Sequence, residues 1–223
     1  MDMILMIISL VITLGAQLFV SGAYSKYSKV KNKKRMSGSE AARYILDKNG
    51  LKDVKVRRVG GYLSDYYDPR NKTVNLSSAN YENASVGALS VACHECGHAI
   101  QDKVGYTFMR IRAALVPFVN FSSYAGYFAI LFGCLFDSMN LIWFGIFAEM
   151  VILLFQIVTL PVEIDASKRA IKELDKYELL DKDELSGGKT MLIAAALTYV
   201  ASVATTVIQI LRLILTFGNR DDR

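Results

Sequence analysis

Four long apolar blocks dominate the sequence, at residues 3–20, 113–136, 141–160 and 190–216. Each block is long enough to cross the hydrocarbon core of a bilayer as a helix, and charged residues are rare inside it. Hydrophobic residues make up 52% of the chain and the mean hydropathy is +0.28, which is high for a water-soluble protein. The pattern predicts a mainly α-helical membrane protein with about four transmembrane helices and a small α+β domain outside the bilayer.

These blocks divide the chain into five expected segments. They are an N-terminal transmembrane anchor (1–23), a cytoplasmic α+β domain (24–112), a transmembrane hairpin (113–160), a cytoplasmic helix (161–189) and a C-terminal transmembrane helix with a short tail (190–223). The helix at 161–189 is expected to end near Gly187-Gly188, since paired glycines favour a break.

Positive charge gives the expected orientation. A basic cluster directly follows the first apolar block, whereas only Asp2 precedes it, so the positive-inside rule places the chain from Tyr24 onward in the cytoplasm. The cluster consists of Lys26, Lys29, Lys31, Lys33, Lys34 and Arg35. The alternative is a cleaved signal peptide ending at Ser21-Gly22-Ala23, but a signal peptide carries its positive charge before the apolar core. The net charge of +5 therefore reflects the membrane boundary, and we expect no nucleic-acid partner.

The polar segment before residue 84 shows weaker patterns. Residues 37–50 predict a short helix capped by Ser37 or Ser39 and stopped by Gly50. Alternating apolar positions predict strands at 53–59 and 72–76, with a strand or an ordered loop at 62–67 and a proline turn at 68–71. We expect these strands to form a small antiparallel sheet. Its edge either binds an extended peptide or only supports the following helix, and the sequence leaves both possibilities open.

Residues 84–103 predict a helix that carries the motif His94-Glu95-Cys96-Gly97-His98. Residues four apart lie on one helix face, so His94 and His98 can offer ring nitrogens to one metal ion. Glu95 is turned about 100° away and can accept a proton from water beside the metal. The alternative without metal binding is two partly buried histidines on an amphipathic helix. The chain contains only 2 histidines, both in this motif, which favours the metal site.

The third metal ligand cannot be a histidine, because none remains. A carboxylate or a thiolate must complete the site, and the segment Pro161–Ala170 supplies carboxylates on another helix. Two spans separate this segment from the motif, so Glu163 returns to the same side of the bilayer as His94 and His98. A thiolate is the weaker alternative, because Cys93 and Cys96 are turned away from the metal face and are expected to be small buried apolar side chains. With Cys134, the odd number of cysteines fits a reducing compartment.

The chain resembles the YugP-type neutral zinc metallopeptidases of bacterial membranes and is more distantly similar to the HtpX and CAAX prenyl-protease group of membrane gluzincins. The resemblance rests on the N-terminal anchor, Tyr66-Tyr67-Asp68-Pro69-Arg70, the helix from His94 to Gln101, the span pair and the segment after Pro161. It implies Glu163 as the third zinc ligand, as the first glutamate of an E-x-E-A-D pattern. The last position of that pattern is Ser167 here, so the supporting contact of the usual aspartate is expected from Asp165 or another group.

These observations predict a zinc metalloendopeptidase anchored in the bacterial cell membrane, with a zincin-like domain and its site at the cytoplasmic surface. Zn²⁺ is held by His94, His98 and Glu163, and Glu95 is the general base. The expected partners are the lipid bilayer and a peptide or membrane-protein substrate, and the oligomeric state is left open. The candidates for oxyanion stabilisation are Tyr62, Tyr66, Tyr67 and Tyr106.

Three other functions compete. The first is a non-catalytic membrane scaffold stabilised by zinc, which would not need Glu95. The second is a metal or ion transporter, suggested by Glu149 and Gln156 within the third apolar block, although an interhelical contact explains this pair as well. The third is an intramembrane protease of the site-2 type, whose metal motif would lie inside a full-length span, which the short apolar run before His94 does not provide.

Overall fold

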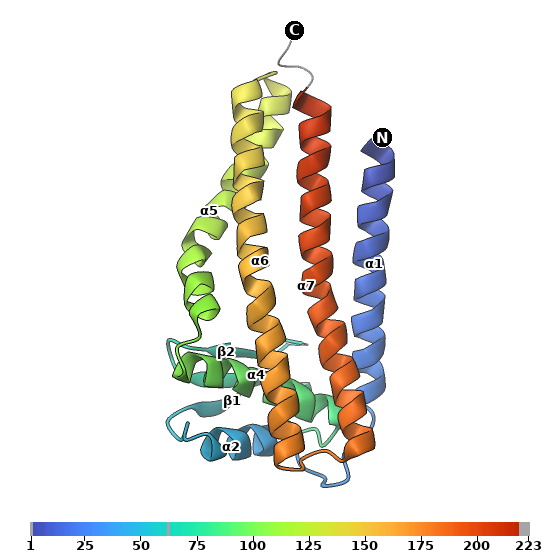
Figure 1. Cartoon of the computed structure of the whole chain (residues 1–223), viewed down its shortest axis with the longest axis vertical. Helices are drawn as coiled ribbons and strands as arrows, with labels where there is room; N and C mark the ends of the chain where they lie inside the picture. The colour runs from blue at the N-terminus through green and yellow to red at the C-terminus, as the bar shows by residue number, and fades with distance from the viewer. Residues whose placement is uncertain (1, 62, 219–223) are drawn as a thin grey trace. The chain divides into compact units, whose positions relative to one another are not determined.

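The computed structural model describes residues 2–61 and 63–218. The helices are α1 (Asp2–Tyr27), α2 (Gly38–Lys48), α3 (Ser78–Tyr81), α4 (Val86–Lys103), α5 (Thr107–Leu135), α6 (Met139–Lys176) and α7 (Lys182–Phe217), and the strands are β1 (Lys55–Val59), β2 (Tyr66–Asp68) and β3 (Thr73–Ser77) (Figure 1). The described residues form two compact units: unit 1 lies within Met1–Gln17, Arg110–Pro161 and Thr198–Arg223, and unit 2 within Leu18–Met109 and Val162–Leu197.

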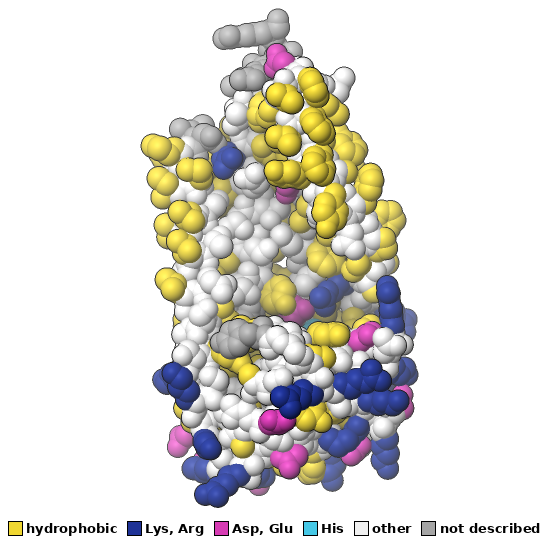
Figure 2. Space-filling view, turned by 180° about the vertical axis from the view of Figure 1, so that it is seen from behind, with side chains coloured by type: hydrophobic (Ala, Val, Ile, Leu, Met, Phe, Trp, Pro, Cys, Tyr) yellow, Lys and Arg dark blue, Asp and Glu magenta, His cyan; other side chains and the backbone are white. Residues whose placement is uncertain are grey.

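Among the residues that the structure describes, four helices are long and apolar enough to cross a membrane: α1, α5, α6 and α7. This confirms the predicted number of spans. Within unit 1 the large apolar side chains point outward, as Figure 2 shows for one face, and Phe118 and Phe121 of α5 are 65% and 68% exposed. A small interior cluster of Ile142, Ile146, Ile210 and Leu213 holds the helices of this unit together. Such an outer surface is stable in lipid and not in water.

Helix α6 contradicts one predicted boundary. It runs without a break through Pro161, from the third apolar block to Lys176. The prediction that a helix over 161–189 ends at Gly187-Gly188 is wrong, because both glycines lie inside α7. They serve close packing: a Cβ on Gly187 would lie 2.5 Å from the Tyr27 ring, and one on Gly188 would lie 2.6 Å from Ser90 Oγ. By local sequence alone, paired glycines predict a helix break. In this structure they allow α1 and α4 to approach α7 closely.

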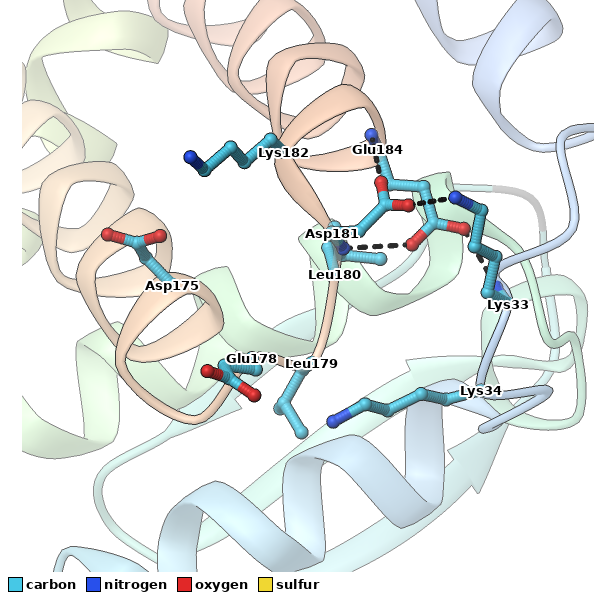
Figure 3. A pocket seen from close by; sticks show the side chains of 9 residues that line it. All are labelled: Lys33, Lys34, Asp175, Glu178, Leu179, Leu180, Asp181, Lys182 and Glu184. Carbon is cyan, nitrogen blue, oxygen red and sulfur yellow. Dashed lines mark hydrogen bonds and ion pairs between the residues drawn. The ribbon is translucent and has the colours of Figure 1, made fainter.

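Five residues connect α6 to α7, and carboxylates fix the start of α7. The Glu184 amide donates to Asp181 Oδ1 at 2.9 Å and the Asp181 amide donates to Glu184 Oε2 at 3.0 Å, a reciprocal cap of the first turn. Lys33 adds an ion pair with Asp181 and a hydrogen bond from its amide to Glu184 Oε1. Beside them lies a pocket of about 410 Å³ with lysines and carboxylates on its wall (Figure 3). These contacts fasten the α6–α7 connection to the segment that follows α1.

The predicted helix at 37–50 is confirmed as α2. Ser37 accepts a hydrogen bond from the Glu40 amide while Glu40 accepts one from the Ser37 amide, and Gly50 at φ +66° follows the helix end. Its apolar face is fully buried, with Ile45 and Leu46 at 0% exposure. This face packs against α4 (Figure 1). The local sequence therefore determined both the ends and the buried side of this helix.

The predicted antiparallel sheet is partly wrong. The strand order is β1-β3-β2, and β3 pairs antiparallel with β2 but parallel with β1. Alternation of apolar positions does not distinguish these pairings. β1 and β2 lie on opposite sides of β3. The connection between Val59 and Tyr66, which contains Gly60 and Gly61, therefore leads from one edge of the sheet to the other. β3 is buried at every residue and is the central strand that packs on α4.

Candidate metal centre

Helix α4 carries the two histidines, and both its start and its packing are well defined. Ser85 caps the helix by accepting a hydrogen bond from the Ala88 amide at 3.0 Å. Gly97 lies where α6 crosses, and a Cβ there would be 2.5 Å from the carbonyl oxygen of Ala166. Only glycine permits this approach of the two backbones. The crossing brings the turn of α6 that contains Glu163 next to the face of α4 that contains His94 and His98.

The structure brings together three of the predicted site residues. Glu163 Oε2 lies 3.2 Å from His94 Nε2 and 3.5 Å from His98 Nε2. One potential ligand atom from each residue lies within 4.8 Å of the others. Glu163 is 3% exposed and His98 is 7% exposed, so the group is largely shielded from solvent. His94 and Glu163, which are 69 positions apart in sequence, therefore lie side by side in unit 2.

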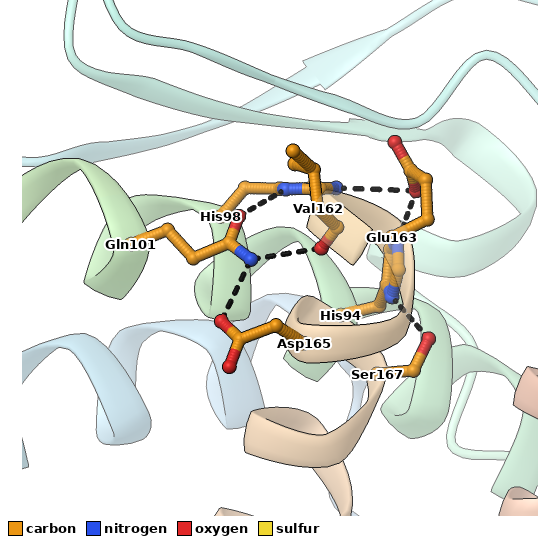
Figure 4. A network of polar contacts seen from close by, with 7 residues as sticks. All are labelled: His94, His98, Gln101, Val162, Glu163, Asp165 and Ser167. Atoms are coloured by element: carbon orange, nitrogen blue, oxygen red, sulfur yellow. Dashed lines mark hydrogen bonds and ion pairs between the residues drawn. The ribbon is translucent and has the colours of Figure 1, made fainter. Parts of the chain in front are cut away.

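Each imidazole has a polar partner on its second nitrogen (Figure 4). His94 Nδ1 lies 3.2 Å from Ser167 Oγ, and His98 Nδ1 lies 3.0 Å from Gln101 Oε1. Gln101 Nε2 in turn donates to Asp165 Oδ2 at 2.8 Å. Ser167 thus makes the contact that the sequence left in doubt, and Asp165 acts one step further away, through Gln101. Both rings are held so that Nε2 faces Glu163.

Gln101 is the residue whose importance the sequence did not reveal. It was visible only as a polar position at the end of the motif helix, three residues after His98. A spacing of three places it on the same helix face as that histidine, which is a signal but a weak one. Its second donor contact, to the carbonyl oxygen of Val162 at 2.8 Å, depends on the crossing of two helices far apart in sequence.

Glu95 is buried on the same helix, at 7% exposure. Burial raises the pKa of its carboxyl group, His94 and His98 oppose this rise, and the charge of Glu163 adds to it. Burial lowers the pKa of His98, but the hydrogen bond and negative charge of Glu163 outweigh burial and leave that pKa raised. The glutamate of the motif thus lies within electrostatic range of all three clustered side chains.

The cysteines of the motif helix lie apart from this cluster. Cys93 and Cys96 are free and buried, and Cys96 Sγ lies 3.6 Å from the carbonyl oxygen of Ala42 on α2. Burial raises the pKa of both thiols, which disfavours the thiolate form that binds metals. Their expected role as buried apolar side chains is confirmed. Cys134 of α5 is exposed on unit 1.

The described tyrosines that were considered for oxyanion stabilisation make no hydrogen bond to His94, His98 or Glu163. Tyr62 lies outside the described residues. Tyr66 is 50% exposed, and the Tyr67 hydroxyl donates to Asp102 Oδ2 at 2.8 Å, which commits its proton elsewhere. Burial and Asp102 together raise the pKa of Tyr67. Tyr106 is bound through its backbone amide to the Gln101 carbonyl, just after α4. The contacts of the described tyrosines therefore select none of them.

Two of the three separations between the potential ligand atoms fit a zinc ion. Ligand atoms about 2.0–2.2 Å from a tetrahedral zinc lie about 3.3–3.6 Å apart, close to the separations between the Glu163 oxygen and the two imidazole nitrogens. Two imidazoles and one carboxylate are a common catalytic zinc ligand set, which leaves a fourth position for water. The supporting contacts at Ser167 and Gln101 are of the kind that zinc-bound histidines make.

Comparisons with known proteins agree with this geometry. Residues 2–218 match the family described as "Putative neutral zinc metallopeptidase". The chain is 41% identical over 218 residues to "Putative membrane protease YugP" of Bacillus subtilis (strain 168), covering 98% of this chain and 97% of that protein. No solved structure matches the chain. Membership of this family implies Zn²⁺ as the cofactor.

Proposed function

The chain belongs to the neutral zinc metallopeptidase family, and on that premise we propose that it is a membrane-anchored zinc endopeptidase with its centre at His94, His98 and Glu163. The observation that carries this proposal is the convergence of the three side chains from two helices, at separations that suit zinc, next to the buried carboxyl group of Glu95. The similarity to a membrane protease supports a peptide or a membrane protein as the substrate.

Each residue has a distinct role in the proposed reaction. His94, His98 and Glu163 hold zinc, which when bound acts as a Lewis acid that acidifies water and polarises a peptide carbonyl. Glu95 accepts a proton from the attacking water and delivers it to the leaving nitrogen as the C–N bond breaks. Ser167 and Gln101 keep the imidazoles oriented. Protons balance over the cycle, because water supplies a hydroxyl group to one product and a hydrogen to the other.

The test is Glu95→Gln, which removes the base but keeps the size of the side chain. Loss of a general base lowers turnover by about 100-fold to 10,000-fold. The purified protein in detergent is incubated with a peptide mixture from digested membrane proteins, and new peptide termini are counted by mass spectrometry. The variant should keep about one zinc per chain. Glu178→Gln, at an exposed carboxyl group, is the matched control. Cleavage by Glu95→Gln at the wild-type rate would refute the proposed role.

The structure supports this proposal over two alternatives. Helix α4 is not among the candidate spans of the described residues, whereas a site-2 type protease would carry its metal motif in one. The cluster contains three donors among the described residues, whereas a purely structural zinc site is normally closed by four protein ligands. An open fourth position and a carboxylate beside it are what hydrolysis requires.

We also propose that the metal centre faces the cytoplasm. The support is the cluster of basic residues directly after the first span, together with the non-basic turn at Asp137 and Ser138. An alkaline phosphatase reporter, which is active only outside the cytoplasm, should be inactive when fused after Lys48 and active when fused after Ser138. The reverse pattern would show that the centre lies on the outer side.

A further inference from the structure

We infer that Gln101 is a positioning residue that fixes which nitrogen of His98 carries a proton and ties this ring to the turn of α6 that bears Glu163. The inference rests on the proposed zinc site and goes beyond it, because it concerns what prepares that site. Gln101 is 0% exposed and touches His98, Val162 and Asp165. It makes no described hydrogen bond to His94 or to the Glu163 carboxylate, so it acts on the site through His98 and through the turn of α6 that bears Glu163.

The orientation of the Gln101 amide follows from its acceptors. Its Nε2 lies 2.8 Å from the Val162 carbonyl oxygen and 2.8 Å from Asp165 Oδ2, and both of these oxygens only accept hydrogen bonds. Each takes one of the two amide protons. Turning the amide over would place its oxygen against these two oxygens, so Oε1 must face His98.

The fixed amide selects one tautomer of the imidazole. Since Oε1 can only accept, His98 Nδ1 must donate, so in the neutral imidazole, the form that binds a metal, the lone pair lies on Nε2, the nitrogen that faces Glu163. His94 lacks such a selector, because the hydroxyl of Ser167 can donate or accept. The proton position is therefore fixed by the neighbouring side chain in His98 but not in His94.

Asp165 and Arg169 hold the Gln101 amide in place. Asp165 Oδ2 accepts from Gln101 Nε2 and also from Arg169 Nε, at 2.6 Å and one helical turn away. The Val162 contact binds the same amide to the residue directly before Glu163. One buried side chain thus couples the position of the third ligand to the protonation pattern of the second. A purely structural role would need only the tie between the helices.

Four variants test whether Gln101 positions the His98 ring or only links α4 to α6. They are Gln101→Met, Gln101→Glu, Asp165→Asn and the double variant Gln101→Glu with Asp165→Asn. Gln101→Met keeps the volume but removes every hydrogen bond. Gln101→Glu keeps the acceptor for His98 but repels Asp165. The double variant restores the pair, because the amide of Asn at 165 can donate to the new carboxylate while the latter still accepts from His98. The contact to the Val162 carbonyl stays broken in all variants of Gln101.

The readout is zinc affinity of the full-length protein in detergent, measured by competition with a chelator. Loss of such a supporting contact weakens zinc binding about 10–100-fold. We expect this loss for Gln101→Met and Gln101→Glu, and recovery to within about fivefold of wild type in the double variant. Ser90→Ala, on the same helix and hydrogen-bonded only to the Val86 carbonyl in the contacts described, is the control and should bind zinc normally. Unchanged affinity in Gln101→Met, or no recovery in the double variant, overturns the inference.

A second readout does not depend on affinity. Because the chain contains 2 histidines, ¹⁵N labelling of histidine gives signals from two rings only. In the zinc-loaded protein the His98 Nδ1 proton should be protected from exchange, and Gln101→Met should remove this protection while His94 is unaffected. Protection that persists in the variant overturns the inference. Failure of the proposed function would be distinguishable from failure of this inference. If the variants change zinc binding as expected but the wild-type protein cleaves no peptide, Gln101 positions His98 and the protein is not a peptidase.

Discussion

The two units of the molecule use buried polar groups in opposite ways. In unit 2 the buried carboxyl, imidazole and amide groups are joined in one network around His94, His98 and Glu163, with Gln101 linking two helices. In unit 1 the surface is apolar, and two described polar atoms, Gln156 Oε1 and Thr159 Oγ1, are buried without a hydrogen-bond partner. The contrast shows that length and hydrophobicity suffice to make a span, whereas chemistry needs polar groups that orient one another.

Two glutamates on α6 provide the sharpest test of this contrast. Glu163 belongs to unit 2, and Glu149, in unit 1, precedes it by 14 residues on the same helix. Glu163→Ala should remove one of three ligands and lower zinc affinity by more than the 10–100-fold cost of a supporting residue. Metal analysis of the purified protein should then find zinc in wild type and almost none in the variant.

Glu149→Ala is the matched change in unit 1. Its carboxyl group is half-buried, and it is not part of the three-donor cluster. This variant should retain zinc and peptide cleavage. Equal loss of zinc in both variants would mean that the network extends through α6 into unit 1. Retention of zinc in Glu163→Ala would remove the third ligand from the proposed centre.

The sequence predicted the site better than the fold around it, and the reasons are local. The motif helix was predictable because the apolar positions and the spacing of His94 and His98 all act within one helix. Counting spans, which needs only hydropathy, predicted that Glu163 returns to the same side of the bilayer as the histidines, and the family resemblance implied it as the third ligand. These signals do not depend on how the helices pack, so they could be recognised without the structure.

The features that the sequence did not predict depend on how distant segments pack together. Gly187-Gly188 read as a helix end because glycine disfavours helices, but contacts with Tyr27 and Ser90 decide its use here. The parallel pairing of β1 with β3 depends on the path of the chain between them, which alternation does not encode. Gln101 could not be assigned, because its partners Val162 and Asp165 reach it only after the helices cross.

Two glycines extend the comparison to packing. A Cβ on Gly97 would lie 2.5 Å from the Ala166 carbonyl oxygen, whereas nothing lies within 4 Å of one on Gly15 of α1. Gly97→Ala should therefore push α4 from α6, cost about 1–3 kcal/mol in thermal unfolding and weaken zinc binding. Gly15→Ala should change stability by less than about 1 kcal/mol and leave zinc binding intact. If Gly97→Ala binds zinc as wild type does, the close crossing is not what positions Glu163.

The smallest effect on zinc binding is expected from the cysteines, and it tests which face of α4 carries the chemistry. Cys93 and Cys96 are buried, and Cys96 faces α2 through the Ala42 carbonyl oxygen, so replacing both with Ala removes packing atoms at a cost of about 1 kcal/mol per site. Zinc content should not change, because the metal-facing side of the helix is untouched. Cys134→Ala, at an exposed position of unit 1, should alter neither quantity. A loss of zinc in the Cys93→Ala, Cys96→Ala protein would move the metal centre to the opposite face of α4, and there Glu163 and Gln101 could no longer serve it.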